Sequence, residues 1–239
     1  MNLVVDVGNT RTKLAVINNS QVVKLWNIAT AGVEDLDKIM SEYTIRRAII
    51  SSVRDHQQEL ATHLSKSVDS LWMDASLKLP FKNRYRSAAT LGNDRKALVS
   101  AAVAEFPGQN TLIISIGTAI TYDFINHQCE YLGGAISPGR HLRFKALHTF
   151  TDQLPLINRS DQKDFIGGDT NASIAAGVLH GIRGETDFFI RQYQEYAEGL
   201  RVILTGGDAK YFDKNLKNNI FARPNLSLVG LNEILEFND

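Results

Sequence analysis

The sequence predicts an α/β protein made of two similarly built halves, residues 1–107 and 108–239. Three observations support this prediction. Each half starts with two apolar strands that flank a short turn containing glycine, and a third strand follows. Each half then continues with helices that alternate with single strands, an order that is typical of α/β folds. A further glycine-containing turn, in residues 205–208, also follows a strand.

In the first half, runs of β-branched and aliphatic residues predict the strands, and apolar residues at helical spacing predict the helices. Pro107 and Gly108 follow the last of these helices, as is typical of a helix end. Pro80 and the polar residues after it predict a loop before that helix. The predicted strands cover residues 3–7, 12–17, 21–25, 48–50 and 70–73, and the predicted helices cover residues 34–42, 57–66 and 95–106.

The second half repeats this order after Gly108. Its first turn, residues 116–119, again contains glycine, and a long helical stretch precedes its last strands. The predicted strands cover residues 111–115, 120–125, 128–132, 201–204 and 219–223, and the predicted helices cover residues 140–150, 170–197, 209–217 and 231–237.

The composition is that of an ordinary globular protein, with 44% apolar and 22% charged residues in 239. Lys plus Arg (26) equals Asp plus Glu (26), so no net charge attracts nucleic acid or an acidic membrane. No apolar run approaches the roughly 20 residues that a membrane span needs, and the N-terminus does not read as a signal peptide. Cys129 is the only cysteine, which fits a reducing compartment. We therefore expect a cytoplasmic protein.

The first predicted turn carries residue types that suit phosphates and a metal ion. Gly8 lets the backbone approach a ligand closely, and the N–H groups of a tight turn favour an anion. Asp6, at the end of the strand, would repel a phosphate, so we interpret it as holding a hydrated divalent cation that phosphates bind. The alternative is an ordinary hairpin in which Asp6 and Asn9 only serve the turn.

Five motifs together identify a family resemblance, because they run from residue 6 over essentially the whole chain. The chain resembles the type III pantothenate kinases, within the superfamily of acetate and sugar kinases, heat-shock ATPases and actin. The motifs are Asp-Val-Gly-Asn-Thr at residues 6–10, Gly-Asn-Asp-Arg at 92–95, Gly-Thr-Ala-Ile-Thr at 117–121, Gly-Gly-Ala-Ile-Ser-Pro-Gly at 133–139, and Gly-Gly-Asp-Thr at 167–170 with Gly177 following.

The resemblance implies both a fold and an activity. The fold would be two duplicated ribonuclease-H-like domains, as in actin-like ATPases, with the nucleotide in the cleft between them. The activity would be transfer of the γ-phosphate of ATP to pantothenate, giving 4'-phosphopantothenate, which is the first step of coenzyme A biosynthesis. Family members use Mg²⁺ and a monovalent cation, potassium or ammonium, and act as homodimers.

The resemblance also assigns roles to residues of this chain. The first hairpin would be the phosphate-binding loop, with Asp6 toward Mg²⁺, and Asp94 would be the catalytic base. The implied ATP-binding residues are Asp6, Val7, Gly8, Asn9, Thr10, Arg11, Thr12, Lys13 and Thr118. The implied pantothenate-binding residues are Tyr85, Gly92, Asn93, Asp94, Arg95 and Thr170.

Asp94 and Arg95 suit the two polar groups of pantothenate, a primary hydroxyl and a carboxylate. A carboxylate can accept the hydroxyl proton during attack on the γ-phosphorus, and an arginine can bind a carboxylate through two parallel hydrogen bonds. The alternative for this motif is structural: Asn93 or Asp94 is simply the N-cap of the helix that follows. Because the chain also carries the phosphate motifs, we favour the catalytic role.

Two positions depart from the family's frequent pattern. Ser115 stands where an aspartate is common, and Asn93 stands where alanine is common. A serine hydroxyl is a neutral oxygen ligand, so we expect Ser115 to hold the monovalent cation more weakly, unless another acid such as Asp123 reaches the same site.

Two other functions stay open. One is a nucleotide-binding transcription-accessory protein on the same scaffold, although such a protein should lack an acid at Asp6 or Asp94, and this chain keeps both. The other is a kinase for a different small hydroxy-acid or sugar. We further expect a homodimer, because loops around Tyr85 and Thr170 are too exposed to close a pocket without a partner's surface.

Overall fold

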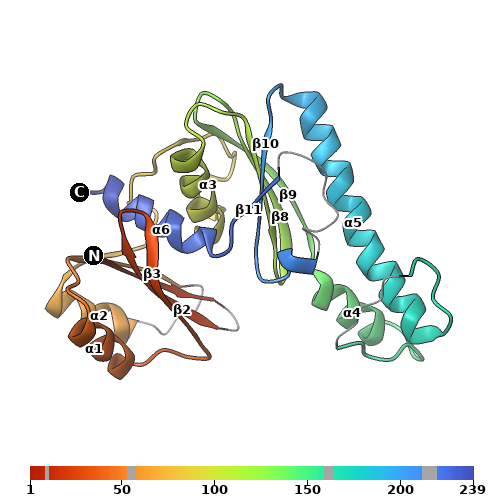
Figure 1. Ribbon diagram of the computed structural model, residues 1–239, viewed down its shortest axis with the longest axis horizontal. Coiled ribbons are helices and arrows are strands. Elements are labelled where there is room, and N and C mark those ends of the chain that lie inside the picture. The colour runs from red at the N-terminus through yellow and green to blue at the C-terminus, as the bar shows by residue number, and fades with distance from the viewer. Residues whose placement is uncertain (9–10, 53–57, 159–163, 212–219) are drawn as a thin grey trace. The chain divides into compact units, whose positions relative to one another are not determined.

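The computed structural model describes residues 1–8, 11–52, 58–158, 164–211 and 220–239, and it divides into two units (Figure 1). The first unit combines Met1–Pro107 with Asn225–Asp239, and the second is Gly108–Pro224. The division at Pro107 agrees with the sequence, but the last 15 residues (225 to 239) do not lie in the second unit as expected. The predicted boundary of 108–239 is therefore wrong at its end.

The first unit is a mixed sheet with strand order β3-β2-β1-β4-β5. Strands β1 and β2 form the predicted hairpin and are antiparallel, whereas β1, β4 and β5 run parallel. Its elements are β1 (Asn2–Val7), β2 (Thr12–Asn18), β3 (Gln21–Ile28), α1 (Val33–Glu42), β4 (Arg47–Ser52), α2 (Gln58–Ser67), β5 (Asp69–Trp72), β6 (Lys82–Asn83), a 3₁₀ helix η1 (Ala88–Thr90), α3 (Asn93–Glu105) and α6 (Leu226–Phe237).

The second unit repeats this topology, with strand order β9-β8-β7-β10-β11. The first three strands of this unit are antiparallel, and β7, β10 and β11 run parallel, so each strand has a counterpart of the same direction in the first unit. Its elements are β7 (Thr111–Ile116), β8 (Ala119–Ile125), β9 (Glu130–Pro138), α4 (Arg140–Thr149), α5 (Thr170–Tyr196), β10 (Arg201–Thr205), a 3₁₀ helix η2 (Ala209–Tyr211) and β11 (Ile220–Ala222).

Most element bounds lie within a few residues of those predicted, and three differ more. The predicted helix over 209–217 is a 3₁₀ helix over Ala209–Tyr211, and the rest of that range lies outside the described residues. Strand β9 continues through Pro138, six residues beyond the predicted end at Leu132 (138 − 132). Helix α6 starts at Leu226 rather than at the predicted Leu231. Gly230 therefore lies inside the helix, although glycine disfavours a helix interior.

Both faces of β1 are buried, and successive residues of this strand point to opposite sides of the sheet. Leu3 and Val5 of β1 belong to the apolar cluster formed with α1 and α2. Val4, between them, belongs to a second cluster that contains Leu231 and Leu235 of α6. Strand β1 is therefore a central strand, and α6 covers one of its faces.

Helix α6 also packs closely against α3, and the two helices lie side by side in Figure 1. A Cβ placed on Gly230 would overlap the backbone carbonyl of Ala97, so only glycine allows this approach. The apolar side chains on α6 thus complete the core of the first unit, which explains why the C-terminal residues return to it.

Polar contacts fasten the end of α6 to the start of the same sheet. The Arg47 side chain, which is 8% exposed, donates to Asp69 (2.8 Å), to the carbonyls of Leu235 (3.0 Å) and Asn238 (3.2 Å), and to Asp239. A buried guanidinium needs such partners, because burying it unpaired is costly.

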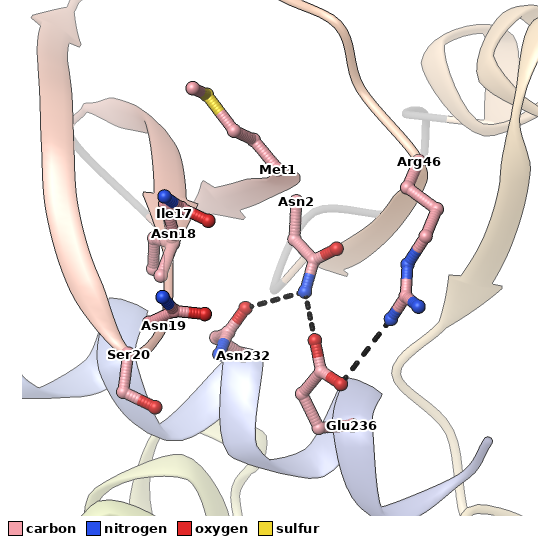
Figure 2. Close-up of a pocket in the computed structure, with 9 residues that line it drawn as sticks. All are labelled: Met1, Asn2, Ile17, Asn18, Asn19, Ser20, Arg46, Asn232 and Glu236. Carbon is pink, nitrogen blue, oxygen red and sulfur yellow. Dashed lines mark hydrogen bonds and ion pairs between the residues drawn. The ribbon is translucent and has the colours of Figure 1, made fainter.

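A hollow of about 380 Å³ adjoins this end of α6 (Figure 2). Asn2 donates from its side-chain amide to Asn232 (2.9 Å) and to Glu236, and Arg46 reaches Glu236 from the rim at 3.5 Å. These bonds satisfy polar groups that β1 and α6 bury against each other, so we assign the hollow a structural role.

In the part of the chain that the structure describes, no helix combines the length and the apolar composition that a membrane span requires.

We expect Arg47→Ala to lower the free energy of unfolding of the first unit by about 2–3 kcal/mol, because several hydrogen bonds to one charged group are lost. Urea denaturation followed by tryptophan fluorescence measures this effect. Both tryptophans, Trp26 and Trp72, lie in the first unit, so the signal reports on that unit.

Arg46→Ala is the matched control, because the Arg46 side chain is 62% exposed. Its effect should stay within about 0.5 kcal/mol. Equal losses in the two variants would show that Arg47 does not fasten α6.

Candidate functional site

The hairpin of β1 and β2 places Asp6 beside a lysine. The N–H of Gly8 donates to the carbonyl of Arg11 at 3.0 Å and closes the turn. Asp6 and Lys13 are then directly opposite each other in the antiparallel register. Cross-strand partners point to the same side of a sheet, so their opposite charges lie on one face. Asn9 and Thr10, which are predicted to bind ATP, lie outside the described residues.

The other predicted residues of the hairpin point elsewhere. Val7 and Thr12 are fully buried, and Val7 belongs to the cluster with α1 and α2, on the sheet face opposite to Asp6. The Arg11 side chain is exposed and donates to the carbonyl of Asn27 at 3.4 Å. Because the side chains of Val7 and Thr12 are buried, these two residues can bind a nucleotide only through their backbone.

Asp6 and Asp94 come from distant parts of the sequence, and Asp94 lies within electrostatic range of Asp6 in the structure. Burial raises the pKa of Asp6 above its ordinary value, and the negative charge of Asp94 raises it further. Lys13 and a long hydrogen bond from Ser227 (3.4 Å) lower it and only partly offset the rise. Two neighbouring carboxylates of this kind favour a bound cation, which relieves their repulsion.

Asp94 is not the N-cap of α3. The N-cap is Gly92, and Asp94 is the second residue of the helix, so the structural alternative for this residue is wrong. The carboxylate folds back over Gly92, and a Cβ on Gly92 would overlap its Oδ1. The absence of a side chain at Gly92 therefore leaves the space that the Asp94 carboxylate occupies.

The two residues beside Asp94 have different roles: Asn93 supports the turn, and Arg95 contacts another predicted site residue. Asn93 donates to the carbonyl of Met73 (3.0 Å) and accepts from Lys96 (3.3 Å), so its side chain anchors the turn. The Arg95 guanidinium lies over the ring of Tyr85, 5.5 Å from its centroid, and the residue is 5% exposed. The structure thus brings two predicted pantothenate residues, Tyr85 and Arg95, into contact near Asp94.

In the second unit, the turn between β7 and β8 corresponds to the first hairpin. The N–H of Gly117 donates to the carbonyl of Ala119 at 3.0 Å, and Thr118 is exposed at the tip. The N–H of Gly139 donates to the carbonyl of Thr118 at 3.0 Å. Thr118 therefore lies at the exposed tip of a turn that Gly139 stabilises through a hydrogen bond.

Ser115 is the counterpart of Asp6, because each is the residue before the last in the first strand of its sheet. Its neighbours across the sheet are Thr121 on β8 and Thr205 on β10, so three hydroxyls lie in a row. Asp123, two residues along β8, is fully buried and accepts a hydrogen bond from Tyr131 at 2.7 Å. Asp123 is thus engaged beside this row, within the sheet.

Thr170 is the first residue of α5 and is exposed. Asp169 caps this helix, because its Oδ1 accepts a hydrogen bond from the N–H of Ala172 at 2.8 Å. Thr170 and Thr118 belong to the second unit, whereas Asp6, Tyr85 and Asp94 belong to the first.

Ser227 is the site residue that sequence reasoning missed. It lies in the first turn of α6, whose start was predicted five residues too late (231 − 226). The apolar Leu-Ser-Leu-Val run at 226–229 was the only signal.

Among the described residues, no group of three or more His, Cys, Asp and Glu side chains is arranged to hold a metal ion. A magnesium ion at Asp6 would therefore take most of its ligands from phosphates and water, as Mg²⁺ usually does. The donor set fits such a hydrated ion.

Comparison with known proteins identifies close relatives. A family model described as type III pantothenate kinase matches residues 2–192. A type III pantothenate kinase from Christiangramia forsetii is 45% identical and covers 100% of this chain and 99% of its own. One from Bacteroides fragilis is 40% identical with the same coverage.

Solved structures share the fold at low sequence identity. A protein from Campylobacter jejuni described as a Baf-family transcriptional activator gives a TM-score of 0.62 at 19% identity, covering 99% of this chain and 98% of its own. A protein from Listeria monocytogenes described as an N-acetylmannosamine kinase gives 0.56 at 11% identity, covering 100% and 99%. With the duplicated sheet topology, these likenesses confirm the predicted actin-like ATPase and sugar-kinase fold.

Proposed function

The chain belongs to the type III pantothenate kinases and phosphorylates pantothenate with ATP in coenzyme A biosynthesis, and we propose that Asp94 is the base of this reaction. One observation carries the proposal. The Asp94 carboxylate lies in the first turn of α3 without serving as its cap, folded back over Gly92 and within electrostatic range of Asp6.

Asp94 would take up the proton of the primary hydroxyl of pantothenate. As the hydroxyl oxygen bonds to the γ-phosphorus of ATP, the bond to the leaving ADP oxygen breaks, and the hydroxyl proton goes to the Asp94 carboxylate. The N-terminus of α3 lies beside this carboxylate, and a helix N-terminus favours negative charge.

Arg95 and Tyr85 would bind the other end of pantothenate. A guanidinium recognises a carboxylate through two parallel hydrogen bonds, and the ring of Tyr85 holds the Arg95 side chain in one orientation. Gly92 and Asn93 would contribute through the backbone of the same turn, and Thr170 would contribute from the start of α5.

Asp6 would hold the hydrated magnesium ion, and Gly8 would offer its backbone to the phosphates of ATP. When bound, the ion neutralises charge on the phosphates during transfer. Lys13 shares the sheet face of Asp6 and adds a positive charge toward the same phosphates. Thr118 and the glycine turns would contact ATP from the second unit.

A transcription-accessory role is the competing proposal, because one protein of similar fold is described as a transcriptional activator. That likeness, at 19% identity, shows the fold alone. Asp6 and Asp94 are both present, which favours the kinase.

We also propose a cytoplasmic location. The single cysteine, Cys129, is unpaired, which suits a reducing compartment, and the substrate ATP is plentiful there.

We expect Asp94→Asn to reduce kcat by at least about 100-fold, the lower range for loss of a general base, with both KM values little changed. Gly92→Ala should reduce kcat by about 10- to 100-fold, because the Cβ of the new alanine displaces the Asp94 carboxylate. The backbone of Gly92, at φ −58° and ψ 144°, accepts alanine without strain, so this variant should still fold. Steady-state kinetics with pantothenate and ATP measure both effects.

Asp37→Asn, which alters an exposed acid on α1, is the control and should leave kcat unchanged. A near-normal kcat in Asp94→Asn would exclude Asp94 as the base. Turnover of another acceptor, with no phosphopantothenate formed, would instead exclude pantothenate as the substrate.

We propose that a monovalent cation, potassium or ammonium, binds at Ser115 and is held weakly. The row of Ser115, Thr121 and Thr205 offers neutral oxygens, whereas Asp123 is buried and already accepts a hydrogen bond. Without a carboxylate in this row, the attraction to a cation lacks a full negative charge.

Ser115→Asp should therefore lower the potassium concentration that gives half-maximal rate by about 10-fold, equivalent to one modest ion contact. Initial rates against potassium concentration, in a buffer without other activating cations, measure this. Ser115→Asn is the uncharged control. If natural protein and Ser115→Asp respond identically to potassium, position 115 does not control the cation.

We propose a homodimer that associates through the second unit. Phe150, Phe165 and Ile166 are 85%, 79% and 81% exposed. Phe150 lines an apolar groove of about 670 Å³ between α4 and α5, together with Leu147 and Ile174. Exposed apolar side chains gathered in this way mark an association surface.

Light scattering should report a dimer for the natural protein and a monomer for Phe150→Asp. Phe237→Asp, at a 52% exposed position on α6 of the first unit, is the matched control and should stay dimeric. A fully active natural protein that is monomeric at assay concentration would contradict this proposal.

A further inference from the structure

Three turns of the second unit meet at the turn between β7 and β8. The N–H of Gly139 donates to the carbonyl of Thr118, and the N–H of Asp208 donates to the carbonyl of Ile116, both at 3.0 Å. A Cβ on Gly139 or on Gly206 would overlap backbone carbonyls of this turn. The three backbones are therefore in direct contact, and glycine is required where they meet.

A side-chain ion pair joins the two outer turns to each other. Nε and Nη2 of Arg140 lie 3.3 Å from the two carboxylate oxygens of Asp208, one oxygen each. The Arg140 guanidinium also lies over the ring of Tyr211, 4.7 Å from its centroid. The two charged side chains are only 13% and 21% exposed, so the pair is mostly shielded from water and is screened little by salt. Its two-point geometry fixes orientation as well as distance.

The two glycines before Asp208 have different surroundings. Gly206, at φ +98°, packs inward on Ile116, whereas Gly207 is exposed with no heavy atom within 4 Å of a Cβ position. Gly207 thus presents bare backbone on the outer side of the turn. A flat base or ribose could lie against it, and Asp208 fixes the direction in which that backbone faces.

We propose that Arg140 and Asp208 are positioning residues for ATP: their ion pair holds the Gly206–Gly207 turn in the orientation that receives the nucleotide. This inference rests on the proposed kinase function. Arg140 acts through Asp208 and not by touching ATP. The pair therefore controls the affinity for ATP and leaves the affinity for the acceptor unchanged.

The test is a double-mutant cycle with Arg140→Gln, Asp208→Asn and the two combined. Each single change should raise KM for ATP by about 10-fold, since misplaced binding groups lose affinity steeply, with KM for pantothenate within about twofold. The double variant should be no worse than the poorer single variant, because both changes break one contact. Arg140→Lys keeps the charge without the two-point geometry. Its KM for ATP should lie between those of the natural protein and of Arg140→Gln.

Calorimetric binding of ATP with Mg²⁺, in the absence of an acceptor, gives the same comparison independently of turnover. Arg201→Gln removes an arginine that donates to Gln109 at the other end of β10, and it is the matched control for which no change is expected. If pantothenate is not turned over but the calorimetric cycle shows the coupling, the kinase assignment fails while the positioning role stands.

Unchanged ATP affinity in both single variants would overturn the proposal. A loss in Arg140→Gln alone, with Asp208→Asn normal, would also overturn it, because Arg140 would then contact ATP directly. Absence of ATP binding by the natural protein would overturn it together with the kinase function.

Discussion

The packing of α6 along β1 is the contact on which the first unit depends. One face of β1 presents Asn2, Val4 and Asp6 in succession, and each meets a different part of α6 or its surroundings. Asn2 bonds to Asn232 and to Glu236, near the end of the helix, Val4 shares its apolar cluster, and Asp6 accepts a hydrogen bond from Ser227 in its first turn. The helix therefore runs antiparallel to the strand. The burial that stabilises the sheet also sets the surroundings of the Asp6 carboxylate.

The duplicated topology shows how one scaffold supplies two kinds of chemistry. In the first unit, Asp6 has Lys13 and Ser51 as its neighbours across the sheet, and in the second unit Ser115 has Thr121 and Thr205. The first row is charged and suits a divalent ion with phosphates. The second row is neutral, and the glycine turns beside it offer backbone groups instead. The same strand positions thus carry a charged row in one unit and a neutral row in the other.

The fold class could be predicted because its signals are local. Alternating strands and helices and the glycine turns are properties of short segments, and each half carries the same series. The predicted helix start near Asp94 was less secure, because an acid in the first turn and an acid at the N-cap look alike in sequence. Only the backbone conformation of Gly92 separates the two.

What sequence could not give is long-range contact. Nothing in the run from Leu226 to Gly230 indicates that it packs on Ala97, more than 120 residues earlier (230 − 97 = 133). The electrostatic influence of Asp94 on Asp6 does not follow from their spacing in the sequence. The pairing of Arg140 with Asp208 likewise depends on two turns that are 68 residues apart (208 − 140). Tertiary packing decides all three.

The return of α6 to the first unit has a consequence for how the chain is made. Domains generally fold in the order of their synthesis, N-terminal first. Here the second unit is continuous from Gly108 to Pro224, whereas the first unit lacks one layer of its core until residues 225–239 emerge from the ribosome. During translation, Val4 and its apolar neighbours stay uncovered while the second unit is being completed. The unit that begins the chain is therefore the last to finish.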